Sequence, residues 1–446
     1  MHPMELLERL INAHGVSGNE NQIRDVIRKE IAPLVDEVWT DASGNLIARE
    51  KGRRPRFMLC AHMDDIGLMV REITSKGLLL CAAVGGVNPM AMIGTRVTVE
   101  NTRETVHGLV TTRDISCGYD VEELPGVEDL VVDTGLQRKD LVKRGVTVGS
   151  FLEPAKETNW LIHGNMISGK ALDDRIGCYV LIEVARQLKD SKQDVYFTFT
   201  VQEEVGLYGA RTGAFAIGPQ WAVVVDVTPS EDLSEDTNTG ISLGKGPCLL
   251  HMDESFIADA RLNRAILDVA GKNSIEVQHE VSSFGTTDAT NISTVRRGVP
   301  SSTLSVPVRN VHSTLEIADR RDVDAVIRLL VAMLKDPPAA LRRRARRTRR
   351  VSRAAKTPVK RSRSSKTAKK GKPKAKAKVK VKAEVKTRVK TRVKTRTKAK
   401  TRSKSKSGAG KKSRRRLKSN RTTAPKPGKR TRKTSRGRTR RAKRRS

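Results

Sequence analysis

The sequence predicts an α/β protein with a central mixed sheet flanked by helices, a small barrel-like β domain inserted into it, and a disordered basic C-terminal tail. Strand-like and helix-like segments alternate before about residue 67 and again after about residue 162, short β-like runs fill the interval, and Lys and Arg dominate the end of the chain. We therefore expect four regions, which are the first part of the α/β domain (1–67), the β insert (68–161), the second part of the α/β domain (162–337) and the tail (338–446).

The first part of the α/β domain begins with two predicted helices. Apolar residues recur at helical spacing over 4–13 and again over 19–35, where Pro33 lies near the end. Residues 45–50 and 56–67 are β-rich, and the second of these runs finishes in "AHMDDIG". A strand that ends in polar residues predicts a functional edge of the sheet.

The insert is predicted from the density of its short strands. The runs are "GLMVREI", "GTRVTVEN", "HGLVTT", "DLVVDTG" and "VTVGSFLEP", separated by Gly, Asp and Pro. Such spacing is typical of a small all-β domain.

Strand and helix alternate again in the second part of the α/β domain. We expect a helix over 171–190 after its acids, strands over 195–201 and 221–229, and helices over 261–272 and 322–336. The last helix is followed by Pro337 and Pro338, which cannot continue it.

The first 340 residues and the rest of the chain differ sharply in net charge. The net charge is +38, yet Leu341 to Ser446 carries 51 Lys and Arg against one acid, Glu384, which leaves about −12 for residues 1–340. The tail has no aromatic residue and too few apolar residues to bury a core, so we expect it to be disordered in isolation.

A cationic tail of this kind binds nucleic acid or another polyanion through counterion release. It contains no zinc-finger or RNP-like motif, so we expect binding to be independent of sequence. The alternative is a solvated tail that binds any acidic partner, including the acidic front half of the chain.

The remaining composition predicts a soluble cytoplasmic protein, with nucleoid association if the tail binds DNA. Five cysteines without CxxC spacing indicate reduced thiols. No apolar run approaches the ~20 residues of a membrane span, and the N-terminus lacks a signal pattern, so we expect no membrane partner.

Metal-type ligands follow several of the predicted strands and turns. They are His62 and Asp64, Asp173 and Asp174, Glu203 and Glu204, Asp226, and His312. Ligands in open α/β sheets bind beyond the carboxyl ends of the strands, where these groups would converge. Two histidines with several carboxylates suit zinc, cobalt or manganese, and a two-cation site needs about four to six such ligands.

Each motif also has a simpler interpretation. A lone His-x-Asp is more often a satisfied core histidine, and an Asp-Asp pair before a helix is more often an N-cap. Asp226 could begin a turn, and His312 with Glu316 could be a helix-start pair. Adjacent glutamates usually form a solvated edge. The joint pattern favours the metal interpretation.

The order of the motifs resembles that of the tetrahedral-aminopeptidase or glutamyl-aminopeptidase family of di-metal peptidases. "AHMDDIG", "GKALDDRIG", "VQEEVGLYGA", "VVVDVTPS", "LGKGP", "GTTDAT" and "VHSTLEIAD" carry this resemblance, which covers about residues 4–336. It implies a di-zinc peptidase-like fold, a β insert used for dimerisation, and a homo-oligomer that can reach twelve subunits. Peptides are the implied substrates.

The resemblance also implies a role for each residue. The metal ligands would be His62, Asp173, Glu204, Asp226 and His312, with Asp173 bridging two divalent cations (zinc, cobalt or manganese). Glu203 would be the general base, and Asp64 would orient the ring of His62. The Asp173–Asp174 bond is cis in related peptidases.

Two other hypotheses stay open at this point. One is a nucleoid- or RNA-associated protein whose peptidase fold is inactive. The other is a di-metal hydrolase of another acyl bond or of a glycosidic bond, although glycosidases generally use two carboxylates without metals.

Overall fold

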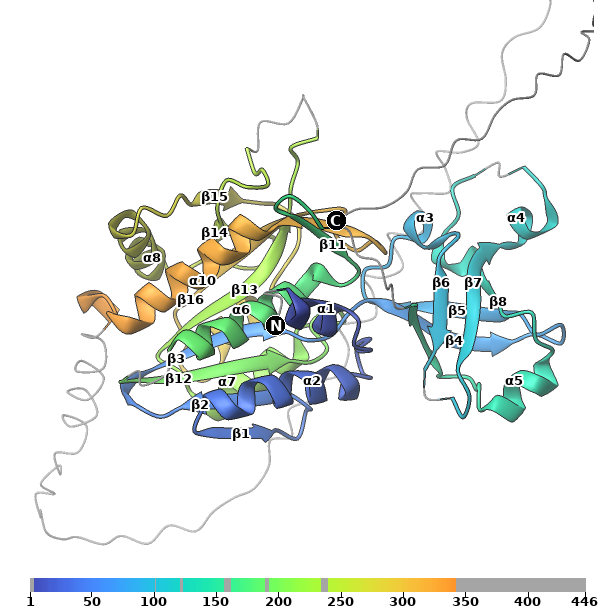
Figure 1. Ribbon diagram of the computed structural model, residues 1–446, viewed down its shortest axis with the longest axis horizontal. Coiled ribbons are helices and arrows are strands. Elements are labelled where there is room, and N and C mark those ends of the chain that lie inside the picture. Colours follow the sequence, from blue (N-terminus) through green and yellow to red (C-terminus); the bar gives the residue numbers. More distant parts are fainter. Residues whose placement is uncertain are drawn as a thin grey trace, which may run out of the picture. The chain divides into compact units, whose positions relative to one another are not determined.

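The computed structural model describes residues 4–100, 102–120, 123–155, 162–188, 192–233 and 240–341. The predicted basic tail beyond residue 341 lies outside the described residues, as does 156–161 at the predicted end of the insert. Within the described part, the predicted fold class is confirmed: a mixed sheet flanked by helices accompanies a separate closed barrel (Figure 1).

The main sheet has eleven strands, of which nine form a continuous path. Their order is β1 (Glu37–Thr40), β2 (Leu46–Glu50), β12 (Gln193–Thr200), β3 (Arg53–His62), β13 (Trp221–Pro229), β16 (Ser301–Arg309), β17 (Glu316–Asp319), β11 (Met166–Gly169) and β10 (Ile162–His163), while β14 (Cys248–Met252) pairs with β15 (Gln278–Val281) and with β16. The central strands β12, β3, β13 and β16 run parallel to one another. Their carboxyl ends therefore meet at one edge of the sheet.

Helices cover both faces of this sheet, which explains why its central strands are nearly continuous apolar runs. One face packs against α1 (Glu5–Ile11), α2 (Asn21–Ile31), α6 (Leu172–Gln187), α8 (Ala260–Lys272) and α10 (Arg320–Lys335), and the other packs against α7 (Tyr208–Ile217) and α9 (Ala289–Thr294). Successive side chains of β3 alternate between the two faces: Leu59 belongs to the first core and Cys60 to the second.

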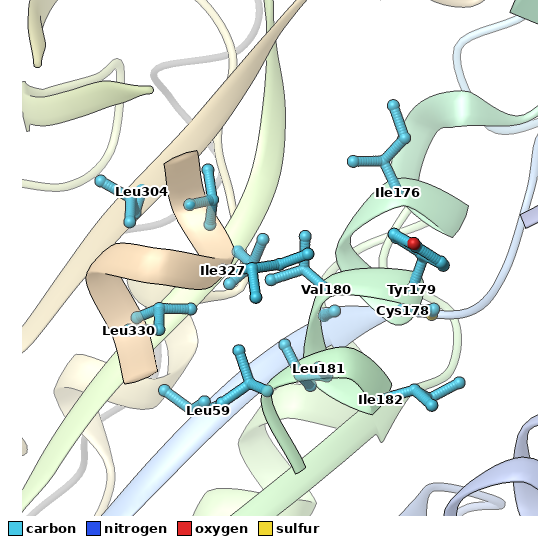
Figure 2. Close-up of a cluster of buried hydrophobic side chains, with 14 of the residues drawn as sticks. Leu59, Ile176, Cys178, Tyr179, Val180, Leu181, Ile182, Leu304, Ile327 and Leu330 are labelled. Carbon is cyan, nitrogen blue, oxygen red and sulfur yellow. The ribbon is translucent and has the colours of Figure 1, made fainter. Parts of the chain in front are cut away.

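The larger core is centred on α6. Figure 2 shows Val180 and Leu181 of α6 close to Leu59 of β3 and to Ile327 of α10. These side chains are at most 5% exposed. Truncation of one of them to alanine would cost about 2–5 kcal/mol. The core thus fixes the position of α6, whose N-terminal end carries Asp173 and Asp174.

The barrel is closed by six strands in the order β4 (Gly67–Ile73), β5 (Leu79–Val84), β8 (Leu130–Asp133), β7 (Val106–Thr112), β6 (Arg96–Val99) and β9 (Phe151–Pro154). Three short helices accompany it: α3 (Pro89–Met92), α4 (Arg113–Cys117) and α5 (Arg138–Arg144). It has its own apolar core, which includes Leu68, Val97 and Leu152. Closure leaves no unpaired sheet edge on this part of the chain.

The described residues include the start of α6 and all five cysteines. The predicted helix over 171–190 corresponds to α6, but Asp173 and Asp174 have non-helical backbone angles and their peptide bond is cis. All five cysteines are free. No helix in the described ranges is long and apolar enough to cross a membrane.

Candidate metal centre

The carboxyl ends of the parallel strands bring most of the predicted site residues together around one cavity. His62 ends β3, Glu203 and Glu204 follow β12, Asp226 lies in β13, and His312 follows β16. Asp173 reaches the same place from the N-terminal end of α6. All six line a cavity of about 500 Å³.

Asp173 lies between the two histidines. Its Oδ1 is 3.0 Å from Nε2 of His62, and its Oδ2 is 3.4 Å from Nε2 of His312. The side chain is largely buried, so its two oxygens are committed to this cavity. One carboxylate therefore faces both imidazoles, which is the position that a bridging ligand requires.

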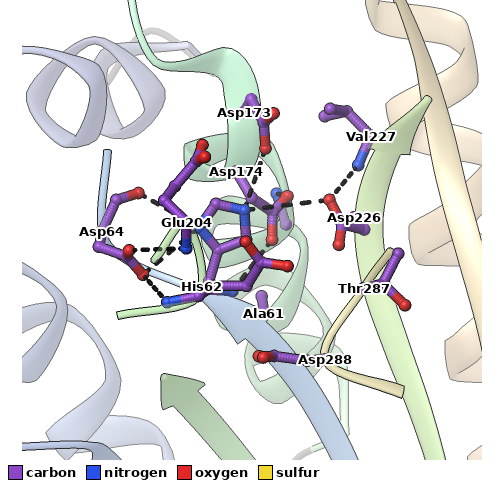
Figure 3. A network of polar contacts seen from close by, with 12 residues as sticks. Ala61, His62, Asp64, Asp173, Asp174, Glu204, Asp226, Val227, Thr287 and Asp288 are labelled. Carbon is purple, nitrogen blue, oxygen red and sulfur yellow. Dashed lines mark hydrogen bonds and ion pairs between the residues drawn. The ribbon is translucent and has the colours of Figure 1, made fainter. Parts of the chain in front are cut away.

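Each histidine has a second carboxylate nearby. Glu204 Oε1 lies 3.2 Å from Nε2 of His312. Asp226 Oδ1 lies 4.0 Å from Nε2 of His62, a contact that Figure 3 shows. Ligand atoms of His62, Asp173 and Glu204 all lie within 4.8 Å of one another, as do those of His62, Asp174 and Asp226. The cavity thus contains two overlapping groups of potential metal ligands.

The electrostatics of the cavity favour positive charge at its centre. Burial raises the pKa values of Glu203 and Asp226 well above their ordinary values. Contacts with Asp173 and Glu204 raise the pKa of His312 to about 11. Burial alone would raise the pKa of Asp173, but His312 and His62 hold it below its ordinary value. Buried carboxylates this close together repel one another unless cations lie among them.

Asp64 contacts the ring of His62 and also supports the two glutamates. Its carboxylate Oδ1 is 3.6 Å from Nδ1 of His62, and its backbone carbonyl oxygen is 3.2 Å from that nitrogen. The carboxylate also accepts hydrogen bonds from the backbone N–H groups of Glu203 (3.0 Å) and Glu204 (3.2 Å), and from Oγ of Ser17 (2.5 Å). Asp64 therefore lies behind the ring of His62 and anchors the backbone of the two glutamates through its side chain.

Asp174 does not share the orientation of Asp173. Its Oδ1 accepts a hydrogen bond from the N–H of Gly177 at 2.9 Å, which is a capping contact at the start of α6. Its Oδ2 accepts one from the N–H of His62 at 3.2 Å. The simpler N-cap interpretation thus describes Asp174, while Asp173 points at the histidines.

Glu316 is a site residue whose position the sequence did not indicate. It begins β17, so the interpretation of His312 and Glu316 as a helix-start pair is wrong. Its carboxylate accepts hydrogen bonds from the N–H of Asp173 and from the N–H of His312, both at 2.9 Å. One fully enclosed carboxylate thus fixes the backbone of two predicted ligands, although its local sequence contains no signal of this.

Asp288, in the "GTTDAT" motif, is a second buried acid at this edge of the sheet. Its Oδ2 accepts hydrogen bonds from Oγ1 of Thr200 (2.5 Å) and from Sγ of Cys60 (3.5 Å), and it lies below His62 in Figure 3. Its Oδ1 is buried without a partner among the described residues. Burial raises the pKa of Asp288 to about 6.

The donor set fits divalent cations. It combines two imidazoles with Asp173, Glu204 and Asp226, and among the described residues no lysine or arginine lines the cavity. Histidine and carboxylate donors suit zinc, cobalt and manganese. The donors are also held in place, because Glu316 accepts the backbone N–H of Asp173 and Asp64 accepts that of Glu203.

The chain has a mixed α/β sheet with a barrel insert, and its histidines and carboxylates gather in a cavity at the ends of the parallel strands. This combination of fold and site defines a hydrolase of the peptidase class. Comparison with protein families makes this assignment specific. The model of the M42 glutamyl aminopeptidase family matches residues 44–329, and the chain belongs to this family.

Individual relatives agree with the family assignment. Lysyl aminopeptidase of Pyrococcus furiosus is 36% identical over 338 residues, which cover 74% of this chain and 96% of that protein. The crystal structure of a TET aminopeptidase from the marine sediment archaeon Thaumarchaeota archaeon SCGC AB-539-E09 superimposes with a TM-score of 0.73 at 31% identity, covering 77% of this chain and 99% of that chain. The TET1 peptidase of Pyrococcus horikoshii, which can assemble into a tetrahedron or a large octahedral shell, gives a TM-score of 0.67 at 32% identity, covering 74% and 99%. The predicted family and enzyme class are confirmed.

Proposed function

We propose that the protein is a metal-dependent aminopeptidase that removes N-terminal residues from peptides with the help of two divalent cations. The observation that carries this proposal is the position of Asp173, with one carboxylate oxygen toward His62 and the other toward His312. Asp173 would be a ligand shared by the two cations. His62 and Asp226 would complete one position, and His312 and Glu204 the other.

The cations, which would be zinc, cobalt or manganese, supply Lewis acidity: when bound they lower the pKa of water, polarise the scissile carbonyl group and hold the free amino group of the peptide. Glu203 would act as the general base, taking a proton from the attacking water onto its carboxylate and giving it to the departing amine. Asp64 supports this role because it accepts the backbone N–H of Glu203 and so holds the main chain from which the base projects.

The test is hydrolysis of a panel of aminoacyl-p-nitroanilides by the purified full chain, with cobalt, zinc or manganese, before and after chelation. We expect release that a chelator abolishes and that added metal restores. Release that persists after complete removal of metal would contradict the proposed mechanism. If the protein binds the metals but releases nothing, the alternative of a nucleic-acid protein with an inactive peptidase fold would replace it.

We also propose that the protein is a homo-oligomer in which the β insert (68–161) forms the dimer contact. Support comes from the related TET1 peptidase, which assembles into closed shells. Light scattering of the full chain would give its mass in solution. A mass of twelve subunits would support a tetrahedral shell, a dimer would support the insert contact alone, and a monomer would contradict both.

The basic tail would bind nucleic acid without sequence preference. Support comes from its composition alone, 51 Lys and Arg against one acid over residues 341–446. The full chain and a chain of residues 1–360 should therefore differ in affinity for duplex DNA, and the affinity of the full chain should fall steeply with salt. The shorter chain keeps Leu341, whose carbonyl oxygen accepts a hydrogen bond from Nε1 of Trp221 at 3.1 Å. Equal affinities would exclude this role of the tail.

A further inference from the structure

A second group of histidine and carboxylate side chains lies where the barrel meets the N-terminal helices. His14 follows α1, Glu100 follows β6, and Glu153 lies in β9. Nδ1 of His14 contacts Oε1 of Glu153 and lies 3.1 Å from Oε1 of Glu100. We call these three residues the junction cluster. None of them lines the cavity of the candidate metal centre.

The donor atoms of the junction cluster converge as ligands of one ion would. One atom from each of His14, Glu100 and Glu153 lies within 4.8 Å of the other two. The side chain of Glu153 is fully buried, and those of His14 and Glu100 are 12% and 14% exposed. The second oxygen of Glu153 accepts the N–H of Gly15 at 3.1 Å, which fixes the carboxylate and leaves Oε1 directed at the imidazole.

The partners at the junction cluster are shared between carboxylates. Nζ of Lys170 lies 3.0 Å from Oδ2 of Asp65 and 3.8 Å from Oε1 of Glu153. Nδ1 of His14 contacts both Glu100 and Glu153, but it carries at most one hydrogen and cannot donate fully to two glutamates at once. A divalent cation would accept one oxygen atom from each glutamate, which a single N–H group cannot do.

We propose that Nδ1 of His14, Oε1 of Glu100 and Oε1 of Glu153 bind a third divalent cation. One imidazole with two carboxylates suits zinc, cobalt or manganese, and water would complete the coordination. The ion would join the loop after α1 to two strands of the barrel. This site is independent of the proposed function, because it shares no residue with the cavity that holds His62 and His312.

The test counts bound zinc in the full-length chain after equilibrium dialysis. The background is a His62→Ala/His312→Ala variant, which lacks both histidines of the proposed catalytic site. We expect this background to retain one zinc ion per chain and to lose it when His14→Gln or Glu100→Gln is added. Glu104→Gln is the matched control, because Glu104 is an exposed acid of the same region that pairs with Arg144 instead.

Two further readouts separate metal binding from structural damage. Circular dichroism should show that Glu100→Gln, a shape-conserving change at a partly exposed residue, leaves the fold intact. Anomalous scattering from zinc-soaked crystals should place a peak between His14 and Glu153. If the background and both added variants retain the same number of zinc ions, the proposal is overturned, and His14, Glu100 and Glu153 form only a network of polar contacts. If the unmodified protein binds one ion, which His14→Gln or Glu100→Gln removes and His62→Ala/His312→Ala does not, this proposal stands while the two-cation centre fails.

Discussion

The candidate metal centre and the junction cluster use the same residue types but balance their charge differently. Around the cavity, Asp173, Glu204 and Asp226 face two histidines, and no lysine or arginine among the described residues lines it. Beside the junction cluster, Lys170 is in contact with Asp65 and Glu153. The cavity has a volume of about 500 Å³, whereas the side chains of the junction cluster are at most 14% exposed. If both sites bind ions as proposed, the cavity takes its positive charge from its histidines and the bound ions, whereas the junction also has the ammonium group of Lys170.

The largest expected effect comes from replacing Glu203, the proposed general base. Glu203→Gln keeps the size of the side chain but cannot accept a proton, so kcat should fall by about 10³-fold. The bound metal should not change, because Glu203 is not one of the proposed ligands. Steady-state kinetics together with metal analysis checks this. Loss of metal along with activity would mean that Glu203 is a ligand.

The next largest effect should follow from removing Lys170, the cation of the chain beside the junction cluster. Lys170→Met leaves Asp65 and Glu153 buried without their shared partner, which should lower the free energy of unfolding by about 3 kcal/mol. Urea unfolding followed by circular dichroism measures the change. The matched control is Lys143→Met, at a lysine of α5 with no ion pair among those described. Equal stability of the two variants would show that Lys170 contributes no net stabilisation.

Replacing Glu316 tests whether Asp173 and His312 need the hydrogen bonds that their backbone N–H groups donate to it. Glu316→Gln can accept from only one of the N–H groups of Asp173 and His312, because its amide nitrogen cannot accept the other. We expect metal affinity to fall about 10- to 100-fold, the usual effect of changing a residue that holds metal ligands in place. Competition with a metal chelator of known affinity measures it. An unchanged affinity would reduce Glu316 to a structural residue.

The smallest effect should come from a side chain that crowds His312, one of the proposed metal ligands. A Cβ atom at Gly86 would lie 2.6 Å from Nδ1 of His312, so Gly86→Ala should displace the imidazole and lower kcat/KM by about tenfold. Gly271→Ala is the control, because nothing lies within 4 Å of a Cβ atom built there. Full activity of both variants would show that His312 has room to adjust.

The sequence indicated the strand-end residues because their signal is local. A buried apolar run that stops at His62 or Asp226 can be recognised without knowing its neighbours. The contacts of Ser17 with Asp64, and of His14 with Glu153, join residues 47 and 139 positions apart, and no local pattern encodes them.

Local patterns also misled in specific ways. The spacing of four between His312 and Glu316 is helical, yet pairing with β11 makes Glu316 part of a strand. The central strand β16 was not predicted, because its serines and Pro307 weaken the strand signal. In both cases tertiary pairing decided the outcome, and a single sequence does not display it.

The loop from His14 to Ser17 shows that the barrel is not a detachable module. At one end of this loop, His14 contacts Glu153 of the barrel, and at the other, Ser17 donates to Asp64, which holds the backbone of Glu203. Gly86, just beyond barrel strand β5, also lies close to the ring of His312. Excision of the barrel would therefore remove part of the frame that aligns the base and one ligand. A smaller working enzyme cannot be obtained by shortening this chain at its insert, and relatives of it should keep or lose the two parts together.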